Sequence, residues 1–324
     1  MNRLNRFFHS RNCTALIYVV AVVLTYVAYQ TGQVRAITGS QGIALQSPNS
    51  WITSGGLSLA AGMVLLALTA VSFVALNKVY NVMREPSALM SSLYVVMVMS
   101  MPMAAGQVYG GVLLSGVMLA VVALMFSCYG DTTANRRVYI TSFIMSLAAL
   151  VQYTFVFYLP IVIVGLAQMR ILNVRSLLAM LMGVVSTVWI LYGVGAIGLS
   201  DIEWPRFAST LSQQSVTEKI VSLTAVGLTM ILGFAAMCAN LMKMLSYNAK
   251  FRAYNGFLTV IFLSTMLFMA IDYSNYTAYF PILSLTAAYQ MAHYFAMRRQ
   301  RGIVWVILAV MVAYLGIYAV RYFV

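Results

Sequence analysis

The forty residues RRVYITSFIMSLAALVQYTFVFYLPIVIVGLAQMRILNVR, residues 136–175, decide how this chain folds. Arginines close both ends, and the 32 residues between them, 138–169, are mostly apolar. One straight helix of that length would measure about 48 Å at about 1.5 Å per residue. The hydrocarbon core of a bilayer is only about 30 Å thick. The stretch is therefore too long for one membrane crossing and short for two.

The composition of the whole chain places this stretch in a membrane protein. Of the 324 residues, 62% are hydrophobic and 8% are charged. A soluble domain of this size cannot bury that much apolar side chain, because its surface needs polar cover. Apolar runs of about twenty residues recur along the chain, with no separate soluble domain, repeat or low-complexity tract. We therefore expect a single all-α integral membrane domain over residues 1–324.

The apolar runs divide the chain into ten stretches. We expect the stretch 138–169 to form a short helical hairpin and so to count as two segments, which gives 11 in all. The basic N-terminus followed by an apolar run is interpreted as an uncleaved first span, because no small-x-small cleavage site follows it. The ten stretches are Cys13–Tyr29, Gly56–Leu76, Leu89–Ala105, Tyr109–Tyr129, Val138–Met169, Ser176–Leu199, Ile220–Met242, Gly256–Ile271, Ala278–Met297 and Ile303–Val320.

The positions of the basic residues argue for the hairpin. Cytoplasmic loops carry an excess of Lys and Arg. If the N-terminus is cytoplasmic and the hairpin returns to its own side, four of the 19 basic residues face outward and the other 15 face the cytoplasm. A single pass would invert every later loop and abolish the bias. The chain should therefore have its N-terminus inside and its C-terminus outside. The four outward cations are Arg35, Lys219, Arg206 and Arg321.

The hairpin itself should be enclosed by protein. Its turn is expected near Gln152–Tyr158, which leaves arms of about 15 residues, or roughly 23 Å of helix each. An exposed turn at that depth would leave backbone groups without partners in lipid. We therefore expect other helices or a cavity to surround the tip.

Motifs of known chemistry are missing from the sequence. There is no P-loop, no G-x-G-x-x-G, no H-E-x-x-H and no G-x-S-x-G. The three cysteines have no metal-ligand spacing, and the two histidines are both expected on the cytoplasmic side. We therefore expect no cofactor and no metal. The formal charge of +13 lies in short loops, so the expected partners are membrane lipids and not nucleic acid.

Neutral polar and aromatic residues within the spans are candidates for contact with a substrate. The alternative is helix–helix hydrogen bonding and the ordinary placement of aromatic residues at membrane interfaces. The candidates are Gln152, Tyr153, Tyr158, Asn240 and Gln290.

The cytoplasmic cations are candidates for binding a lipid phosphate or diphosphate by charge-assisted hydrogen bonds. The alternative is that they serve only as the topology signal. The candidates are Lys78, Arg84, Arg136, Arg137, Arg170 and Arg175.

Three segments carry a resemblance to known proteins. They are VSFVALNKVYNVMREPSALMSSLYVVMVMSMP (residues 71–102), the hairpin stretch with aromatic residues before Pro160, and YFPILSLTAAYQMAHYF (residues 279–295). In these segments the chain resembles an uncharacterised family of polytopic integral membrane proteins of Bacteroidota. The resemblance implies a multi-pass protein of the bacterial inner (cytoplasmic) membrane. It implies no activity, because the family has none assigned.

In outline the chain also resembles membrane glycosyltransferases of the GT-C class and related oligosaccharide polymerases and ligases. These have a cytoplasmic N-terminus and functional outer loops after the first and seventh segments, which in this chain are Thr31–Gly55 and Ser200–Lys219. The resemblance implies action on polyprenyl-phosphate-linked sugars at the outer face. Unlike the acid-using members, this chain has no Asp or Glu in its first outer loop, Thr31–Gly55. The residues implied for catalysis are the arginines Arg35 and Arg206 and, as outer general bases, Asp201, Glu203 and Asp272.

Three hypotheses for function follow. The first is handling of a lipid-linked glycan or polyprenyl-phosphate substrate in the biogenesis of the cell envelope. The second is transport or flipping of a lipid or amphipathic solute, along a path lined by the neutral polar residues. The third is a non-catalytic membrane scaffold with a protein partner that the sequence does not identify. The first rests on topology, which is a weak guide to function.

Overall fold

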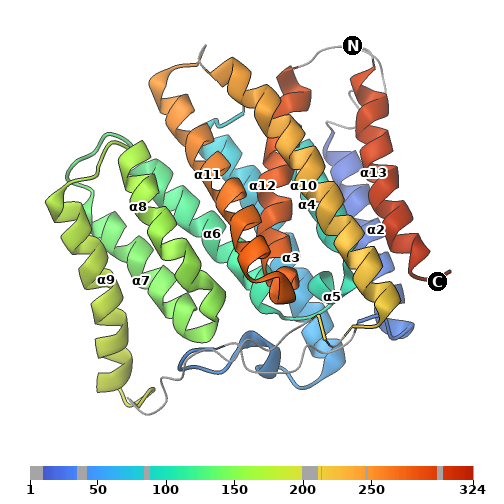
Figure 1. The fold of residues 1–324 in the computed structure, drawn as a ribbon, viewed down its shortest axis with the longest axis horizontal. Helices are drawn as coiled ribbons and strands as arrows, with labels where there is room; N and C mark the ends of the chain where they lie inside the picture. Colours follow the sequence, from blue (N-terminus) through green and yellow to red (C-terminus); the bar gives the residue numbers. More distant parts are fainter. Residues whose placement is uncertain are drawn as a thin grey trace.

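A computed structural model describes residues 10–34, 42–83, 88–198, 211–212, 214–244, 247–297 and 302–323. Within these ranges helices are the only regular secondary structure (Figure 1). In chain order the elements are α2 (Arg11–Gln30), η1 (Pro48–Ser50), α3 (Gly55–Tyr80), α4 (Ala88–Met99), α5 (Pro102–Ala105), α6 (Gly110–Ser127), α7 (Asn135–Val151), η2 (Tyr153–Tyr158), α8 (Leu159–Gln168), α9 (Val174–Gly193), α10 (Val216–Met244), α11 (Ala249–Ile271), η4 (Tyr273–Asn275), α12 (Tyr276–Met297) and α13 (Ile303–Val320).

Seven of the described helices are long and apolar enough to cross a membrane. They are α2, α3, α6, α9, α10, α11 and α13. The other expected segments coincide with helices that are shorter or more polar, namely α4 with α5, α7, α8 and α12. The chain is therefore an all-helical protein with the character of a membrane protein.

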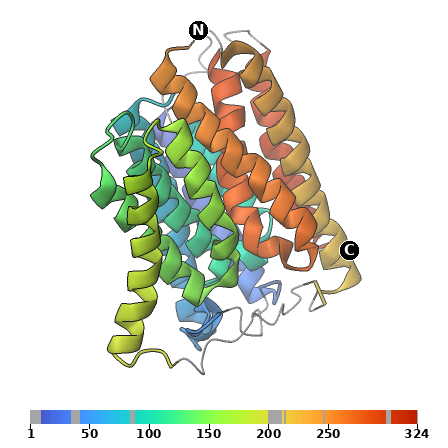
Figure 2. The same cartoon turned by 60° about the vertical axis from the view of Figure 1, so that its left-hand side comes forward.

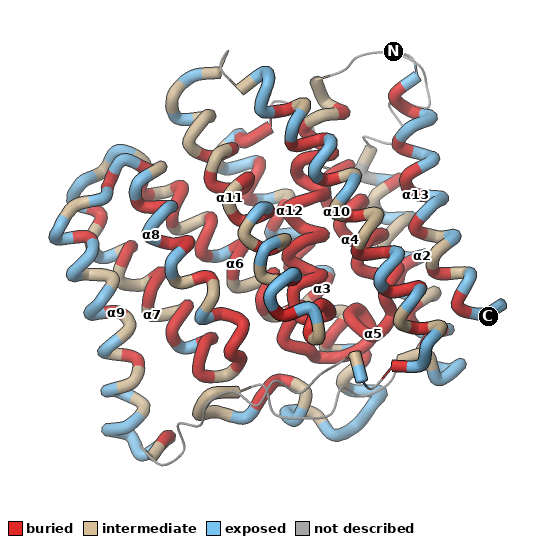
Figure 3. Tube along the Cα trace, in the orientation of Figure 1, coloured by how far each residue is buried: buried red, intermediate tan, exposed pale blue. Residues whose placement is uncertain are grey.

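Helix α12 lies at the centre of the bundle. It packs against α4, α6, α10 and α11, and nearly all of its side chains are buried (Figure 3). Its many Thr, Ser, Tyr and Gln side chains lower its hydropathy. Such side chains are tolerated in a buried helix when neighbouring helices supply their hydrogen bonds. This explains why the most buried helix is not among the most apolar ones.

The stretch that opened the sequence analysis forms a hairpin, as predicted. Helix α7 ends at Val151, the chain passes through the short helix η2, and α8 returns. The backbone N–H of Gly130 donates to the carbonyl of Met169 at 3.0 Å, which joins the two ends of the hairpin. Pro160 lies in the first turn of α8, where its missing N–H costs nothing.

The tip of the hairpin is enclosed, also as predicted. Gln152, Tyr153 and Tyr158 are buried. Part of the first expected outer loop, Thr31–Gly55, reaches the end of α7, where the N–H groups of residues 43–45 all donate to the carbonyl of Leu150 at 3.0–3.2 Å. Protein groups therefore replace water as partners for this non-helical backbone.

Helix α9 lies at the edge of the bundle and packs chiefly on α7 (Figure 2). A Cβ on Gly183 would lie 2.7 Å from the carbonyl oxygen of Tyr139, so glycine allows this close approach. The rest of α9 presents large apolar side chains outward, including Trp189 and Leu181. This is the pattern of a helix facing lipid or another apolar surface.

The bundle has two ends that differ in charge. We call one the basic end; it carries the chain around residues 81, 130, 170 and 248, which hydrogen bonds and a shared pocket bring together. The other, the distal end, carries the hairpin tip and η4. Of the cations whose side chains are described, those at the distal end are Lys219 and Arg321. Those at the basic end are Lys78, Arg136, Arg137, Arg170, Arg175, Lys243, Lys250 and Arg252.

Candidate functional site

Asp272 lies at the distal end, at the C-terminus of α11, with only 8% of its surface exposed. It is the one predicted catalytic residue that the structure describes. The other four, Arg35, Asp201, Glu203 and Arg206, lie outside the described residues. A buried carboxylate is costly unless other groups supply hydrogen bonds or opposite charge, so its partners determine what it can do.

Three side chains bind the Asp272 carboxylate. The hydroxyl groups of Tyr153 and Tyr279 both donate to Oδ2, the second at 3.2 Å. The amide of Asn275 donates to Oδ1 at 3.0 Å and to the Tyr153 hydroxyl at 2.8 Å. We call these four residues the Asp272 cluster. It joins the hairpin tip to α11, η4 and α12 by charge-assisted hydrogen bonds, which are stronger than neutral ones.

The Asp272 cluster contains a negative charge without a described countercharge. Among the described residues, no Lys or Arg nitrogen lies within the 4.0 Å of an ion pair with Asp272. Its partners are neutral hydroxyl and amide groups. These hydrogen bonds fix the orientation of the Asp272 carboxylate, and a carboxylate can serve as a general base when it reaches the proton of a substrate.

Described parts of both expected outer loops attach beside the Asp272 cluster. Residues 43–45 bind the carbonyl of Leu150, two residues before Gln152. In the second expected outer loop, Ser200–Lys219, the N–H of Leu211 donates to the carbonyl of Ser274 at 3.0 Å, beside Asn275. The loops that the sequence singled out therefore border the one candidate carboxylate that can be placed.

The approach of α6 to the hairpin tip depends on glycine. A Cβ on Gly110 would lie 1.7 Å from Oε1 of Gln152, which is fully buried. The neighbouring Tyr109 hydroxyl is 2.9 Å from the Thr277 hydroxyl on α12. The start of α6 is thus fixed on both the hairpin tip and the first turn of α12, next to the Asp272 cluster.

The predicted substrate residues divide into separate groups. Gln152 and Tyr153 lie at the hairpin tip, and the hydroxyl of Tyr158 is 2.9 Å from that of Thr265. Asn240 donates from Nδ2 to the carbonyl of Gln290 at 2.8 Å and to its Oε1 at 2.9 Å. That last pair joins α10 to α12, as the helix–helix alternative describes. The five residues are not brought to one place.

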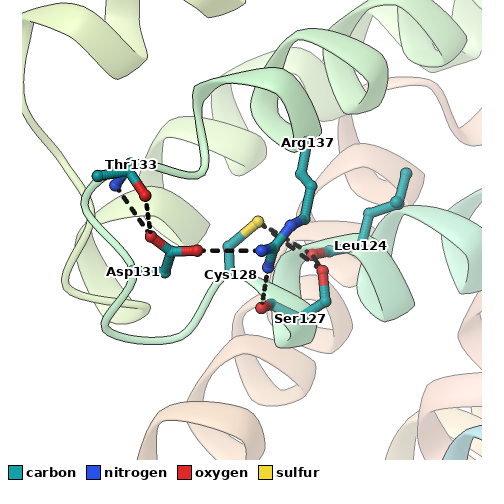
Figure 4. A network of polar contacts seen from close by, with 6 residues as sticks. All are labelled: Leu124, Ser127, Cys128, Asp131, Thr133 and Arg137. Atoms are coloured by element: carbon teal, nitrogen blue, oxygen red, sulfur yellow. Dashed lines mark hydrogen bonds and ion pairs between the residues drawn. The ribbon is translucent and has the colours of Figure 1, made fainter.

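Among the predicted phosphate-binding cations, Arg137 has its partners within the chain (Figure 4). Its guanidinium donates to the carbonyl of Ser127 and, at 3.0 Å, to Asp131 Oδ2. The backbone N–H and hydroxyl of Thr133 donate to Oδ1 of the same carboxylate at 3.0 and 2.6 Å. These bonds from Thr133, followed by the charge of Arg137, hold the pKa of Asp131 below its usual value. The network joins the end of α6 to the start of α7.

The remaining predicted cations contribute less to the described site. Lys78, Arg136, Arg170 and Arg175 are exposed on different elements of the basic end, as a topology signal also requires. Arg84 lies outside the described residues.

A lateral groove is a feature that the sequence did not indicate. It has a volume of about 620 Å³ between α3 and α6 and is lined mainly by apolar side chains, such as Leu68, Leu113 and Ala120. Tyr80 lines this groove and also a smaller polar pocket of about 210 Å³ at the basic end, which includes Lys250. The periodicity of apolar residues on a fully apolar helix does not reveal such a groove, because every face has the same character.

Sequence reasoning also missed Asn275 and Tyr279. The run DYSNYTAY, residues 272–279, offered a signal, since it places polar and aromatic groups after a span. Among the described residues, no group of three or more His, Cys, Asp or Glu is arranged to hold a metal.

Comparisons with known proteins gave no match. No protein-family model, no curated protein and no solved structure is significantly similar to the chain. The resemblances drawn from sequence segments therefore remain predictions.

Proposed function

We propose that the chain crosses the cytoplasmic membrane of a bacterial cell with 11 segments, its N-terminus inside and its C-terminus outside. The charge difference between the ends of the bundle supports this orientation, since cations favour the cytoplasmic side. The start of α2 and the end of α13 lie at opposite ends of the bundle in Figure 1, as an odd number of segments requires. The distal end then faces the outside.

The proposed activity is the handling of a lipid-linked glycan, or another polyprenyl-phosphate substrate, at the outer face. One observation carries this proposal: Asp272 is a buried carboxylate at the distal end, bound by neutral donors, with both expected outer loops attached beside it. The lateral groove between α3 and α6 would give the isoprenoid chain of such a substrate an apolar surface.

In the proposed reaction Asp272 acts as general base. Its carboxylate accepts the proton of an acceptor hydroxyl group as that oxygen bonds to the anomeric carbon of the donor sugar. The bond from this carbon to the polyprenyl phosphate oxygen breaks, and the phosphate leaves with the electron pair. Tyr153 and Tyr279 orient the carboxylate. General-base catalysis contributes about 10²- to 10⁴-fold to a rate.

The experiment is glycan transfer by the purified protein in lipid vesicles, with a polyprenyl-phosphate-linked sugar as donor. Asp272→Asn preserves shape and removes the base, so transfer should fall by about 100-fold or more. Asp131→Asn at the basic end is the matched control and should transfer normally. Wild-type rates in the folded Asp272→Asn protein would reject the proposal.

A second candidate function, translocation of a lipid across the bilayer, is favoured by the lateral groove. Ala120 is an exposed residue on its wall, and Ala235 is an exposed alanine on α10 away from it. If the groove carries lipid, Ala120→Phe should slow the flipping of a fluorescent phospholipid in vesicles and Ala235→Phe should not. Flipping that Asp272→Asn leaves unchanged would separate this function from glycan transfer.

A further inference from the structure

Arg321 is a buried cation at the distal end that the proposed function does not use. It follows the last turn of α13 and is 5% exposed. One nitrogen, Nη2, donates to the hydroxyl of Ser222 on α10 at 2.9 Å. The residue therefore lies between two helices, inside the protein, and not in a loop where a topology signal would place it.

Most of the hydrogen-bonding capacity of this guanidinium is unused. Its Nε and Nη1 atoms are buried and have no hydrogen-bond acceptor in the described part of the chain. A guanidinium presents five N–H donors in a fixed plane and cannot lose its charge in a protein. Burial of such donors without acceptors is strongly unfavourable. A further acceptor, bound during function, would account for this arrangement.

The acidic and phenolic groups around Arg321 do not supply acceptors for its Nε and Nη1 atoms. The buried Glu218 is the carboxylate near it, but the two do not approach within the 4.0 Å of an ion pair. Oxygen Oε2 of Glu218 accepts the N–H of Ser215 at 2.7 Å. The nearby hydroxyls also have other contacts. Tyr276 donates to Gln214 at 2.6 Å, and Tyr318 donates to the carbonyl of Leu24 and lies 2.7 Å from the Tyr322 hydroxyl.

We propose that the Arg321 guanidinium binds the phosphate group of the lipid-linked substrate. A phosphate oxygen pair matches the planar donor array of arginine, and it supplies the acceptors that Nε and Nη1 lack. This inference rests on the proposed function and names the substrate contact. Asn275 of the Asp272 cluster and Tyr276 beside Arg321 are consecutive residues, so the start of α12 links the phosphate site to the general base.

Access to this site requires local movement. The guanidinium is covered in the described structure, and Gln214 is bonded to Tyr276 beside it. Gln214 lies in the second expected outer loop, Ser200–Lys219. Displacement of this residue would open a route to Arg321 from the outer face, and the phosphate would replace the covering groups. Glu218 would repel the incoming anion, so its charge should weaken binding.

The test measures binding of a polyprenyl monophosphate to the full chain in detergent. The readout is the rise in the thermal unfolding temperature of the protein as the ligand is added. Wild type should bind it, and the uncharged polyprenol and inorganic phosphate should give at most a weak response. Arg321→Gln should reduce the affinity by about tenfold or more, whereas Lys219→Gln, the matched cation control at the same end, should not. Equal affinity in wild type and Arg321→Gln would overturn the proposal.

A second variant tests the phosphate site even if Arg321→Gln is unstable. Glu218→Gln removes the nearby negative charge and should tighten binding of the polyprenyl monophosphate. Unchanged or weaker binding in that folded variant would overturn the proposal.

A third variant separates the phosphate site from the proposed function. Asp272→Asn should still bind the polyprenyl monophosphate. If Arg321→Gln binds normally and Asp272→Asn abolishes transfer, the phosphate site is wrong and the proposed function stands. Normal transfer by Asp272→Asn rejects the function separately.

Discussion

Two carboxylates at opposite ends of the bundle are stabilised by different kinds of partner. Asp131, at the basic end, is about one-third exposed and pairs with a half-exposed Arg137. Asp272, at the distal end, is buried and is held by two tyrosines and an asparagine. Surface ion pairs are screened by water and contribute little, whereas a buried carboxylate depends fully on its partners. We therefore treat the Asp272 cluster as the proposed site and the Asp131–Arg137 pair as a tether between α6 and α7.

Removal of each carboxylate gives the largest contrast. Asp272→Ala removes the buried carboxylate that accepts hydrogen bonds from Tyr153, Tyr279 and Asn275, so we expect the free energy of unfolding to fall by about 3 kcal/mol or more. Asp131→Ala should cause only a small change. Unfolding in mixed detergent micelles measures both. Similar losses in the two variants would abolish the distinction between site and tether.

Packing around the hairpin tip offers a second contrast. Gly110→Ala places a methyl group on Gln152, and overpacking of this kind costs about 1–3 kcal/mol. Gly227, within α10, has no atom within 4 Å of an added Cβ, so Gly227→Ala should stabilise by about 0.5–1 kcal/mol through helix propensity. The same unfolding assay compares them. If Gly110→Ala leaves the free energy of unfolding unchanged, the hairpin tip is loosely packed.

The third contrast compares the loss of one tyrosine hydroxyl inside the Asp272 cluster with the loss of one outside it. Tyr153 donates to the buried Asp272, while the hydroxyl of Tyr139 is 2.8 Å from that of Ser186 on the peripheral α9. Tyr153→Phe should cost about 1.5–3 kcal/mol, as for bonds to charged groups, and Tyr139→Phe about 0.5–1.5 kcal/mol. Unfolding measurements on both proteins, with the double variant for additivity, decide the order. A larger loss of unfolding free energy in Tyr139→Phe would contradict the claim that the hydrogen bond to the buried Asp272 is the stronger one.

The fold was predictable where local chemistry decides it. Length and flanking arginines predicted the turn at Gln152–Tyr158, because neither depends on distant residues. Asp272 and Tyr153 were each singled out, but 119 residues separate them, and no pattern indicated that they touch. The pairing of Asn240 with Gln290 was equally hidden, since it depends on how α10 and α12 are rotated against each other. Arg321 was counted only as an outward cation, because burial cannot be read from its position at a span end.

The smallest expected effect concerns the pH dependence contributed by Asp131. The hydrogen bonds of Thr133 and the charge of Arg137 lower its pKa in the folded protein. A lowered pKa means that the ionised form stabilises the fold above the unfolded pKa, and that this stabilisation is lost as the pH falls through the folded value. Wild type should therefore lose slightly more stability than Asp131→Asn as the pH falls below about 4. Thr133→Ala removes the larger contribution and should shrink this difference. Thermal unfolding at several acidic pH values measures it. A difference larger than that seen for Tyr153→Phe would mean that the basic end is more than a tether, because an exposed pair is too well screened to have such an effect.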